Sequence, residues 1–168
     1  MDKYVIIVAG GSGKRMGGEM PKQFLIVAGK PILMHTVEAF ARADEGFKFI
    51  LVLPEAHFST WNSLVAEYNF NIPVTLVAGG AERFFSVKNA LAYVPTDALV
   101  AVHDGVRPFA SKETILEAFD VAAEKGSAVP VIDEVDSLRR VQKGESQAVN
   151  RSEYKRVQTP QEIGRAHV

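Results

Sequence analysis

The sequence predicts an α/β fold, a three-layer α/β/α sandwich around a mostly parallel sheet, and three observations lead to this prediction. Short apolar segments rich in β-branched residues recur along the chain, as expected for strands buried on both faces of a parallel sheet. Segments with helical spacing separate them, so strands and helices alternate. The 168 residues, 47% of them hydrophobic, have the size and composition of one domain.

The expected elements follow one another in a regular order. Apolar runs predict strands at 3–8, 48–53, 73–77, 98–103 and 127–132. Helical spacing predicts helices at 31–43, 57–69, 83–93 and 111–125. Pro31 suits a first helical position, Ser111 suits a helix N-terminus and Gly126 suits a helix end. Ligands of such sheets bind at the carboxyl ends of the strands, so we expect the site in the loops there.

A different pattern begins at residue 133, where polar and apolar residues alternate around the turn-like Lys143-Gly144-Glu145. This alternation predicts an antiparallel excursion, because its apolar content is too low for a buried strand. We expect residues 133–158 to form a projecting β-arm.

The composition argues against several classes of partner. A formal net charge of −1 gives no electrostatic reason to expect nucleic acid or an anionic membrane. The chain has no cysteine, which excludes disulfides and thiolate metal sites and permits a reducing compartment. Its apolar runs are too short to span a bilayer. We therefore expect a cytoplasmic protein without nucleic-acid or membrane partners, in which any phosphate site is built from a few local groups.

The segment AGGSGKRMGGEMPKQF, residues 9–24, carries the strongest local signal. Glycines let the backbone approach a ligand and present N–H groups to it, and nearby cations add positive charge. The glycines are Gly10, Gly11 and Gly13, and the cations are Lys14, Arg15 and Lys22. The pattern indicates phosphate binding; the alternative is an ordinary glycine turn with solvated cations.

Two common phosphate motifs do not fit this loop. A Walker A loop would need a glycine at Val8 and a hydroxyl residue at Arg15. A dinucleotide fingerprint would need a third glycine at Met16, and Pro54-Glu55 comes too late for a ribose-binding acid. An ATPase and a dehydrogenase are therefore disfavoured.

The spacing A-G-G-x-G-x-R-M followed by P-K-Q resembles the signature loop of sugar-phosphate nucleotidyltransferases, and its details resemble the 2-C-methyl-D-erythritol 4-phosphate cytidylyltransferase family of the non-mevalonate isoprenoid pathway. Four further segments agree in order and spacing: GGAERFFSV at 79–87, VHDGVRPF at 102–109, VPVIDEVDSLRRV at 129–141 and NRSEYKRVQTPQ at 150–161. The resemblance implies a Rossmann-like nucleotidyltransferase domain over residues 1–161. It also implies transfer of the cytidylyl group of CTP to a sugar-alcohol phosphate, with release of pyrophosphate.

The resemblance assigns roles to individual residues. Negative charge that builds up on the α-phosphate needs fixed cations. The implied catalytic residues are Arg15, Lys22 and Arg151. The implied nucleotide-binding residues are Ala9, Gly10, Gly11, Gly13, Lys14, Gly79, Gly80, Arg83 and Ser86. Backbone groups at Gly79 and Gly80 and the Ser86 hydroxyl would select the cytosine; the alternative is that Ser86 only lies in the first turn of a helix. Ala81 and Phe85 stand where the family can have acidic residues.

The resemblance also implies an acceptor site shared between two subunits. Its residues are Asp104, Arg107, Ser137, Arg151 and Thr159. Asp104 would also contact Mg²⁺ or another divalent cation, since Mg²⁺ takes few protein ligands. The arm would cross into a neighbouring subunit and make a homodimer. One alternative stays open, that Arg151 belongs to a solvated basic face. His103 is expected to pack or to hydrogen-bond locally, because no second histidine is spaced to form a metal pair with it.

Two rival functions remain, ribitol 5-phosphate cytidylyltransferase and an inactive nucleotide-binding fragment. The resemblance stops after Gln161, without the C-terminal elements of the family. The last six residues read as an in-frame translation of a common sequencing-adapter sequence. We therefore expect a C-terminally truncated enzyme with a non-native tail at 162–168, poorly soluble or nearly inactive.

Overall fold

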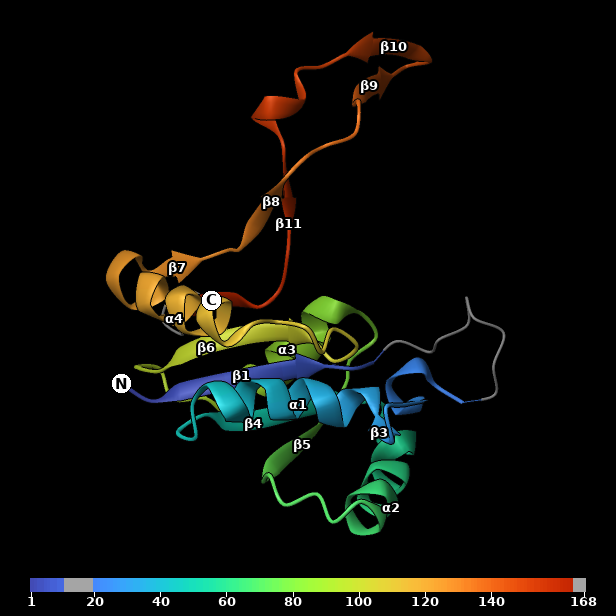
Figure 1. The fold of residues 1–168 in the computed structure, drawn as a ribbon, viewed down its shortest axis with the longest axis vertical. Coiled ribbons are helices and arrows are strands. Elements are labelled where there is room, and N and C mark those ends of the chain that lie inside the picture. Colours follow the sequence, from blue (N-terminus) through green and yellow to red (C-terminus); the bar gives the residue numbers. More distant parts are fainter. Residues whose placement is uncertain (11–19, 165–168) are drawn as a thin grey trace.

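The computed structural model describes residues 1–10 and 20–164 of the chain. Its centre is a six-stranded sheet with the strand order β5-β4-β1-β6-β12-β7 (Figure 1). β12 (Gln161–Gly164) runs antiparallel between β6 and β7 (Ser127–Ala128). The neighbours on the other side are parallel: β1 (Lys3–Val8), β4 (Lys48–Leu53), β5 (Val74–Ala78) and β6 (Leu99–Asp104). The predicted mostly parallel sheet is confirmed.

Helices cover both faces of this sheet and give the predicted three layers (Figure 1). One core contains residues of α1 (Ile32–Ala43), α2 (Phe58–Glu67) and α4 (Lys112–Lys125); the other contains residues of α3 (Arg83–Leu91). Val5 and Ile7 face the first core and Ile6 faces the second, as the two-residue period of a strand requires. None of the helices in the described part of the chain has the length and apolar character needed to cross a membrane.

The predicted ends of α4 are confirmed. Ser111 is its N-cap, and the Ser111 hydroxyl accepts a hydrogen bond from the Thr114 N–H at 3.2 Å. Gly126 ends the helix in the left-handed region with φ 91°, which glycine adopts without steric cost. Pro31 was expected at the first helical position, but it is the N-cap of α1, and the helix begins one residue later, at Ile32.

Short elements join the sandwich at the same end as the loops after the strands. They are η2 (Lys22–Phe24), β2 (Ile26–Val27), β3 (Lys30–Pro31) and η3 (Glu55–His57). Phe24 is 1% exposed and belongs to the larger core, so it fixes η2 to the domain.

The arm projects from the sandwich as two successive antiparallel pairs (Figure 1). Next to the domain β8 (Val131–Asp133) pairs with β11 (Lys155–Val157), and further out β9 (Arg139–Gln142) pairs with β10 (Glu145–Ala148). A short helix, η4 (Arg151–Glu153), lies between β10 and β11. Lys143 and Gly144, with φ of 51° and 86°, form the tight turn at the tip.

The prediction of one buried parallel strand at 127–132 is wrong. The segment contains two strands, β7 in the central sheet and β8 in the arm. Pro130, which has no N–H to donate to a ladder, separates them. Val131 and Ile132 are 47% and 48% exposed, because β8 pairs only with β11 and has no helix over it. The sequence signal was right about extended structure and wrong about burial.

Glu162 in β12 is a buried acid. Its side chain is 1% exposed, and neither carboxylate oxygen has a hydrogen-bond partner in the described part of the chain. Burial penalises the charged form and raises the pKa of Glu162 to about 8. Of the expected non-native tail, 162–164 belong to β12, and 165–168 lie outside the described residues.

Glu162 should make stability decrease with rising pH. Its pKa is about 8 in the folded chain against an ordinary value of 4.5, so between these values the folded state holds a proton that the unfolded state has released. The free energy of unfolding is therefore highest below the lower value and falls as pH rises towards the upper one, by at most about 1.4 kcal/mol per pH unit. Chemical denaturation of the wild type and Glu162→Gln across this range measures the difference. Parallel profiles for the two proteins would contradict the assignment.

Candidate active site

Three loops leave the parallel sheet at its carboxyl edge. The register aligns Val8, the last residue of β1, with Asp104, the last residue of β6, and it also aligns the last residues of β4 and β5. The edge therefore gathers the segments that were predicted to bind nucleotide and acceptor. Their loops begin at Ala9, Gly79 and Gly105.

The loop after β1 is held by a side chain from η2. The Ala9 N–H donates to the Val52 carbonyl at 2.9 Å, which extends the β1–β4 pairing. The Ala9 carbonyl accepts a hydrogen bond from Gln23 Nε2 at 2.9 Å, and Gln23 is 2% exposed. Lys22 precedes Gln23 and is exposed. Four predicted residues, Gly11, Gly13, Lys14 and Arg15, lie outside the described residues.

The loop after β5 closes on itself through Ser86. The Ser86 hydroxyl accepts from the Gly80 N–H at 3.0 Å and donates to the Glu82 carbonyl at 3.2 Å. A methyl group on Gly80 would lie 2.3 Å from Cβ of Phe85, so only glycine fits there. The Gly79 N–H donates to β4 at 2.9 Å. Two N–H donors and the hydroxyl predicted to select the base are thus used inside the protein, and Ser86 lies in the first turn of α3, as the alternative stated.

Asp104 joins the loop after β6 to the start of α3. Its Oδ1 lies 2.7 Å from Arg83 Nη1, and its Oδ2 lies 2.9 Å from Arg107 Nε. A single exposed ion pair contributes little, but one carboxylate with two guanidinium partners restrains both arginines. Arg83, predicted as nucleotide-binding, and Arg107, predicted as acceptor-binding, are therefore neighbours.

Two buried side chains hold the backbone of the same loop. Nε2 of His103 lies 2.9 Å from the Arg107 carbonyl and must be the protonated nitrogen, since a carbonyl only accepts. Burial lowers the pKa of His103, so the ring is neutral, and it packs edge-on against Phe40. Thr36 of α1 donates from Oγ1 to the Gly105 carbonyl at 2.9 Å. The structural role expected for His103 is confirmed.

These contacts define a group of four residues that we call the pinning residues: Gln23, Thr36, Ser86 and His103. The described residues include five buried polar or charged side chains, and the pinning residues are all of them except Glu162. Sequence reasoning missed Gln23 and Thr36. Thr36 could have been found, because it places a hydroxyl on the apolar face of a predicted helix. Gln23 lies in the P-K-Q motif, in which only the lysine was assigned a role.

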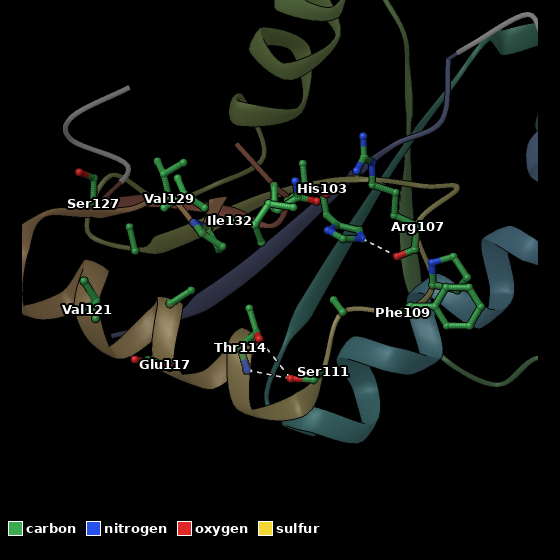
Figure 2. A pocket seen from close by; sticks show the side chains of 18 of the residues that line it. His103, Arg107, Phe109, Ser111, Thr114, Glu117, Val121, Ser127, Val129 and Ile132 are labelled. Carbon is green, nitrogen blue, oxygen red and sulfur yellow. Dashed lines mark hydrogen bonds between the residues drawn. The ribbon is translucent and has the colours of Figure 1, made fainter. Parts of the chain in front are cut away.

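A cavity of about 870 Å³ opens between α4, the loop after β6 and the base of the arm (Figure 2). Arg107 and Thr159, both predicted to bind the acceptor, line it together with His103. Two other predicted acceptor residues, Ser137 and Arg151, lie on the arm and are not among the lining residues. Arg151 donates from Nη1 to the Val135 carbonyl at 2.6 Å, within the arm. One chain thus brings together only part of the predicted acceptor site.

A divalent cation has no preformed protein site in the described part of the chain. No three His, Asp or Glu side chains there are grouped closely enough to hold one. Asp104, the predicted ligand, has an arginine on each carboxylate oxygen. Within the described residues, the one carboxylate predicted to contact the cation is therefore already paired with two arginines.

Solved structures place the fold in a class. A chain from Anaerococcus prevotii, described as 4-diphosphocytidyl-2C-methyl-D-erythritol synthase, matches with a TM-score of 0.81 at 25% identity, over 97% of this chain and 70% of that one. A 2-C-methyl-D-erythritol 4-phosphate cytidylyltransferase from Francisella tularensis matches with a TM-score of 0.79 at 27% identity, over 99% of this chain and 74% of that one. The sandwich with its three edge loops is thus an α/β nucleotidyltransferase fold.

Sequence comparison gives the family. The model of the 2-C-methyl-D-erythritol 4-phosphate cytidylyltransferase family matches residues 3–167. The cytidylyltransferase of that name from Phocaeicola vulgatus is 51% identical over 161 residues, which are 96% of this chain and 74% of the relative. The one from Bacillus licheniformis is 37% identical over 162 residues, 96% of this chain and 70% of the relative. This chain belongs to the 2-C-methyl-D-erythritol 4-phosphate cytidylyltransferase family.

Gly105→Ala should destabilise the protein by about 1 to 3 kcal/mol, because the close approach of two loops leaves no room for a methyl group. An added Cβ would lie 2.8 Å from Cβ of Ala9 and 2.9 Å from Cδ1 of Leu33. Gly10→Ala is the control, since its added Cβ would meet nothing within 4 Å. Urea denaturation of both variants checks this. Equal stability of Gly105→Ala and the wild type would show that the loops are not packed as described.

Proposed function

We propose that this protein transfers the cytidylyl group of CTP to 2-C-methyl-D-erythritol 4-phosphate. The products are 4-diphosphocytidyl-2-C-methyl-D-erythritol and pyrophosphate, in isoprenoid precursor biosynthesis by the non-mevalonate pathway. The observation that carries the proposal is 51% identity over 96% of the chain to a cytidylyltransferase of that name.

The reaction is an in-line substitution at phosphorus. An oxygen of the acceptor's phosphate attacks the α-phosphorus of CTP, a new P–O bond forms, and the bond to the pyrophosphate leaving group breaks. Catalysis of such a step is mostly positioning and stabilisation of developing negative charge. We propose Lys22, Arg15 and Arg151 as the cations that supply this stabilisation. The position of Lys22 supports this catalytic role. Lys22 is exposed, and its neighbour Gln23 contacts Ala9, where the loop after β1 begins.

The nucleotide would lie along the carboxyl edge of the sheet. We propose that its phosphates bind at Ala9, Gly10, Gly11, Gly13 and Lys14, and its cytidine at the turn of Gly79 and Gly80. Since the N–H groups of Gly79 and Gly80 are used internally, the base contacts we propose there are carbonyl oxygens, which accept from the cytosine amino group. Ser86 then acts by holding this turn, and Arg83 by its contact with Asp104.

We propose Mg²⁺, or another divalent cation, as the cofactor, which would neutralise charge on the triphosphate. The described residues do not form a site for it, so the ion would be held chiefly by nucleotide oxygens and water, as is common for Mg²⁺. Contact with Asp104 would require that the carboxylate loosen one of its arginine contacts.

We propose a homodimer in which the arm of one subunit completes the acceptor site of the other. Arg107 and Thr159 line the cavity at the arm's base, and Asp104 is paired with Arg107, whereas Ser137 and Arg151 lie further out on the arm. A second subunit could supply the arm residues that one chain does not bring to the cavity. A cytoplasmic location without nucleic-acid or membrane partners stays a prediction.

Pyrophosphate release measures the proposed activity directly. We expect release that depends on both CTP and 2-C-methyl-D-erythritol 4-phosphate, with ribitol 5-phosphate and ATP as poor substitutes. Equal turnover with ribitol 5-phosphate would favour the rival acceptor. Nucleotide binding without any turnover would indicate the inactive fragment.

Lys22→Ala should lower turnover by about 100-fold and change CTP affinity little, because the cation acts mainly on charge that develops in the transition state. Steady-state kinetics and calorimetric CTP binding separate the two effects. Lys125→Ala, at the far end of α4, is the control that should leave turnover unchanged. Full activity of Lys22→Ala would remove the lysine from the mechanism.

Replacing residues 134–154 with a short flexible linker should give monomers that bind CTP and do not use the acceptor. The segment carries the outer hairpin and Arg151, and its apolar side chains have no core of their own. Sedimentation and the pyrophosphate assay test this. A wild-type chain that sediments as a fully active monomer at micromolar concentration would exclude the shared site.

A further inference from the structure

We propose that Gln23 is a positioning residue, which sets the place of Lys22 relative to the loop after β1. The inference rests on the proposed function. Its basis is one buried contact: Gln23 is 2% exposed and donates from Nε2 to the Ala9 carbonyl at 2.9 Å.

Both ends of this contact are fixed. Ala9 is 5% exposed, and its N–H donates to β4 at 2.9 Å, so the carbonyl that Gln23 reaches belongs to the edge of the sheet itself. On the other side Phe24 is 1% exposed in the larger core, and its N–H donates to the Pro21 carbonyl at 2.9 Å. Lys22 thus lies in a short turn that begins at Pro21, directly before the buried side chains of Gln23 and Phe24.

In the described part of the chain Lys22 is restrained through its backbone, whose carbonyl accepts a hydrogen bond from the Leu25 N–H at 3.2 Å. No ion pair or side-chain hydrogen bond there involves its ammonium group, which extends from an exposed position. A flexible lysine is placed by its backbone, and the Gln23 amide fixes that backbone to the strand. Misplacing a catalytic group by about 1 Å can cost about 100-fold in rate. Loss of the Gln23–Ala9 hydrogen bond should therefore lower kcat by shifting Lys22.

The same amide could have a purely structural role, and a double-mutant cycle separates the two. If Gln23 acts through Lys22, its loss matters only while the lysine is present. If it only stabilises the domain, its loss has the same effect on turnover with and without Lys22.

The test uses Gln23→Met, which keeps the length and approximate volume of the side chain and removes the donor. We expect a fall of about 10-fold or more in kcat with little change in the KM for CTP, and no further fall when Gln23→Met is added to Lys22→Ala. Gln23→Leu, which also lacks the donor and carries no charge, is the second variant if the methionine protein folds poorly.

Thr36→Val is the matched control. Thr36 is also fully buried and also donates to a loop carbonyl, that of Gly105, and its other side-chain hydrogen bond goes to Ile32 of its own helix. Its effect on kcat should add to that of Lys22→Ala. Additive effects of Gln23→Met and Lys22→Ala, or an unchanged kcat in Gln23→Met, would overturn the inference while leaving the proposed function standing. An inactive wild type would overturn both.

Discussion

Backbone carbonyl and N–H groups at the carboxyl edge of the sheet are turned away from water and must find partners inside the protein, and the arrangement of the site depends on this constraint. The ladder itself satisfies some of them, at Ala9, Gly79 and Gly105. The pinning residues satisfy others from the side. Each contributes a buried side chain to a backbone group of a loop, so each loop has a fixed start.

The same contacts explain why the edge suits phosphate chemistry. Because the buried groups are satisfied internally, charged side chains near them are left at the surface, where Lys22, Arg83 and Arg107 lie. Asp104 links two of these cations and thereby links the loop after β5 to the loop after β6. Cations held before the substrate arrives lose little entropy on binding it, which is the requirement for stabilising a charged transition state.

The parallel core was predictable because its signal is local. Val5 and Ile7 lie in one core and Ile6 lies in the other, so both faces of β1 must be apolar, and the continuous apolar run in the sequence shows this. Residues 127–132 show the limit: the same composition forms β7 and an exposed β8, since burial depends on what covers a strand and not on the strand alone. The contacts of Gln23 with Ala9 and of Thr36 with Gly105 join positions 14 and 69 residues apart, and no local pattern encodes such pairs. Ser86 was identified from its motif, and the structure adds that its hydroxyl closes the turn, whereas its contact with the base stays a prediction.

A crystal structure of the protein with CTP would test the central claim most directly, namely that the pinned loops after β1 and β5 together form the nucleotide site. The account predicts the triphosphate beside Ala9, Gly10 and Lys22, the cytosine against the turn of Gly79 and Gly80, and the pinning contacts unchanged. CTP bound instead in the cavity between α4 and the base of the arm, or bound with the Gln23 and Thr36 contacts broken, would contradict it.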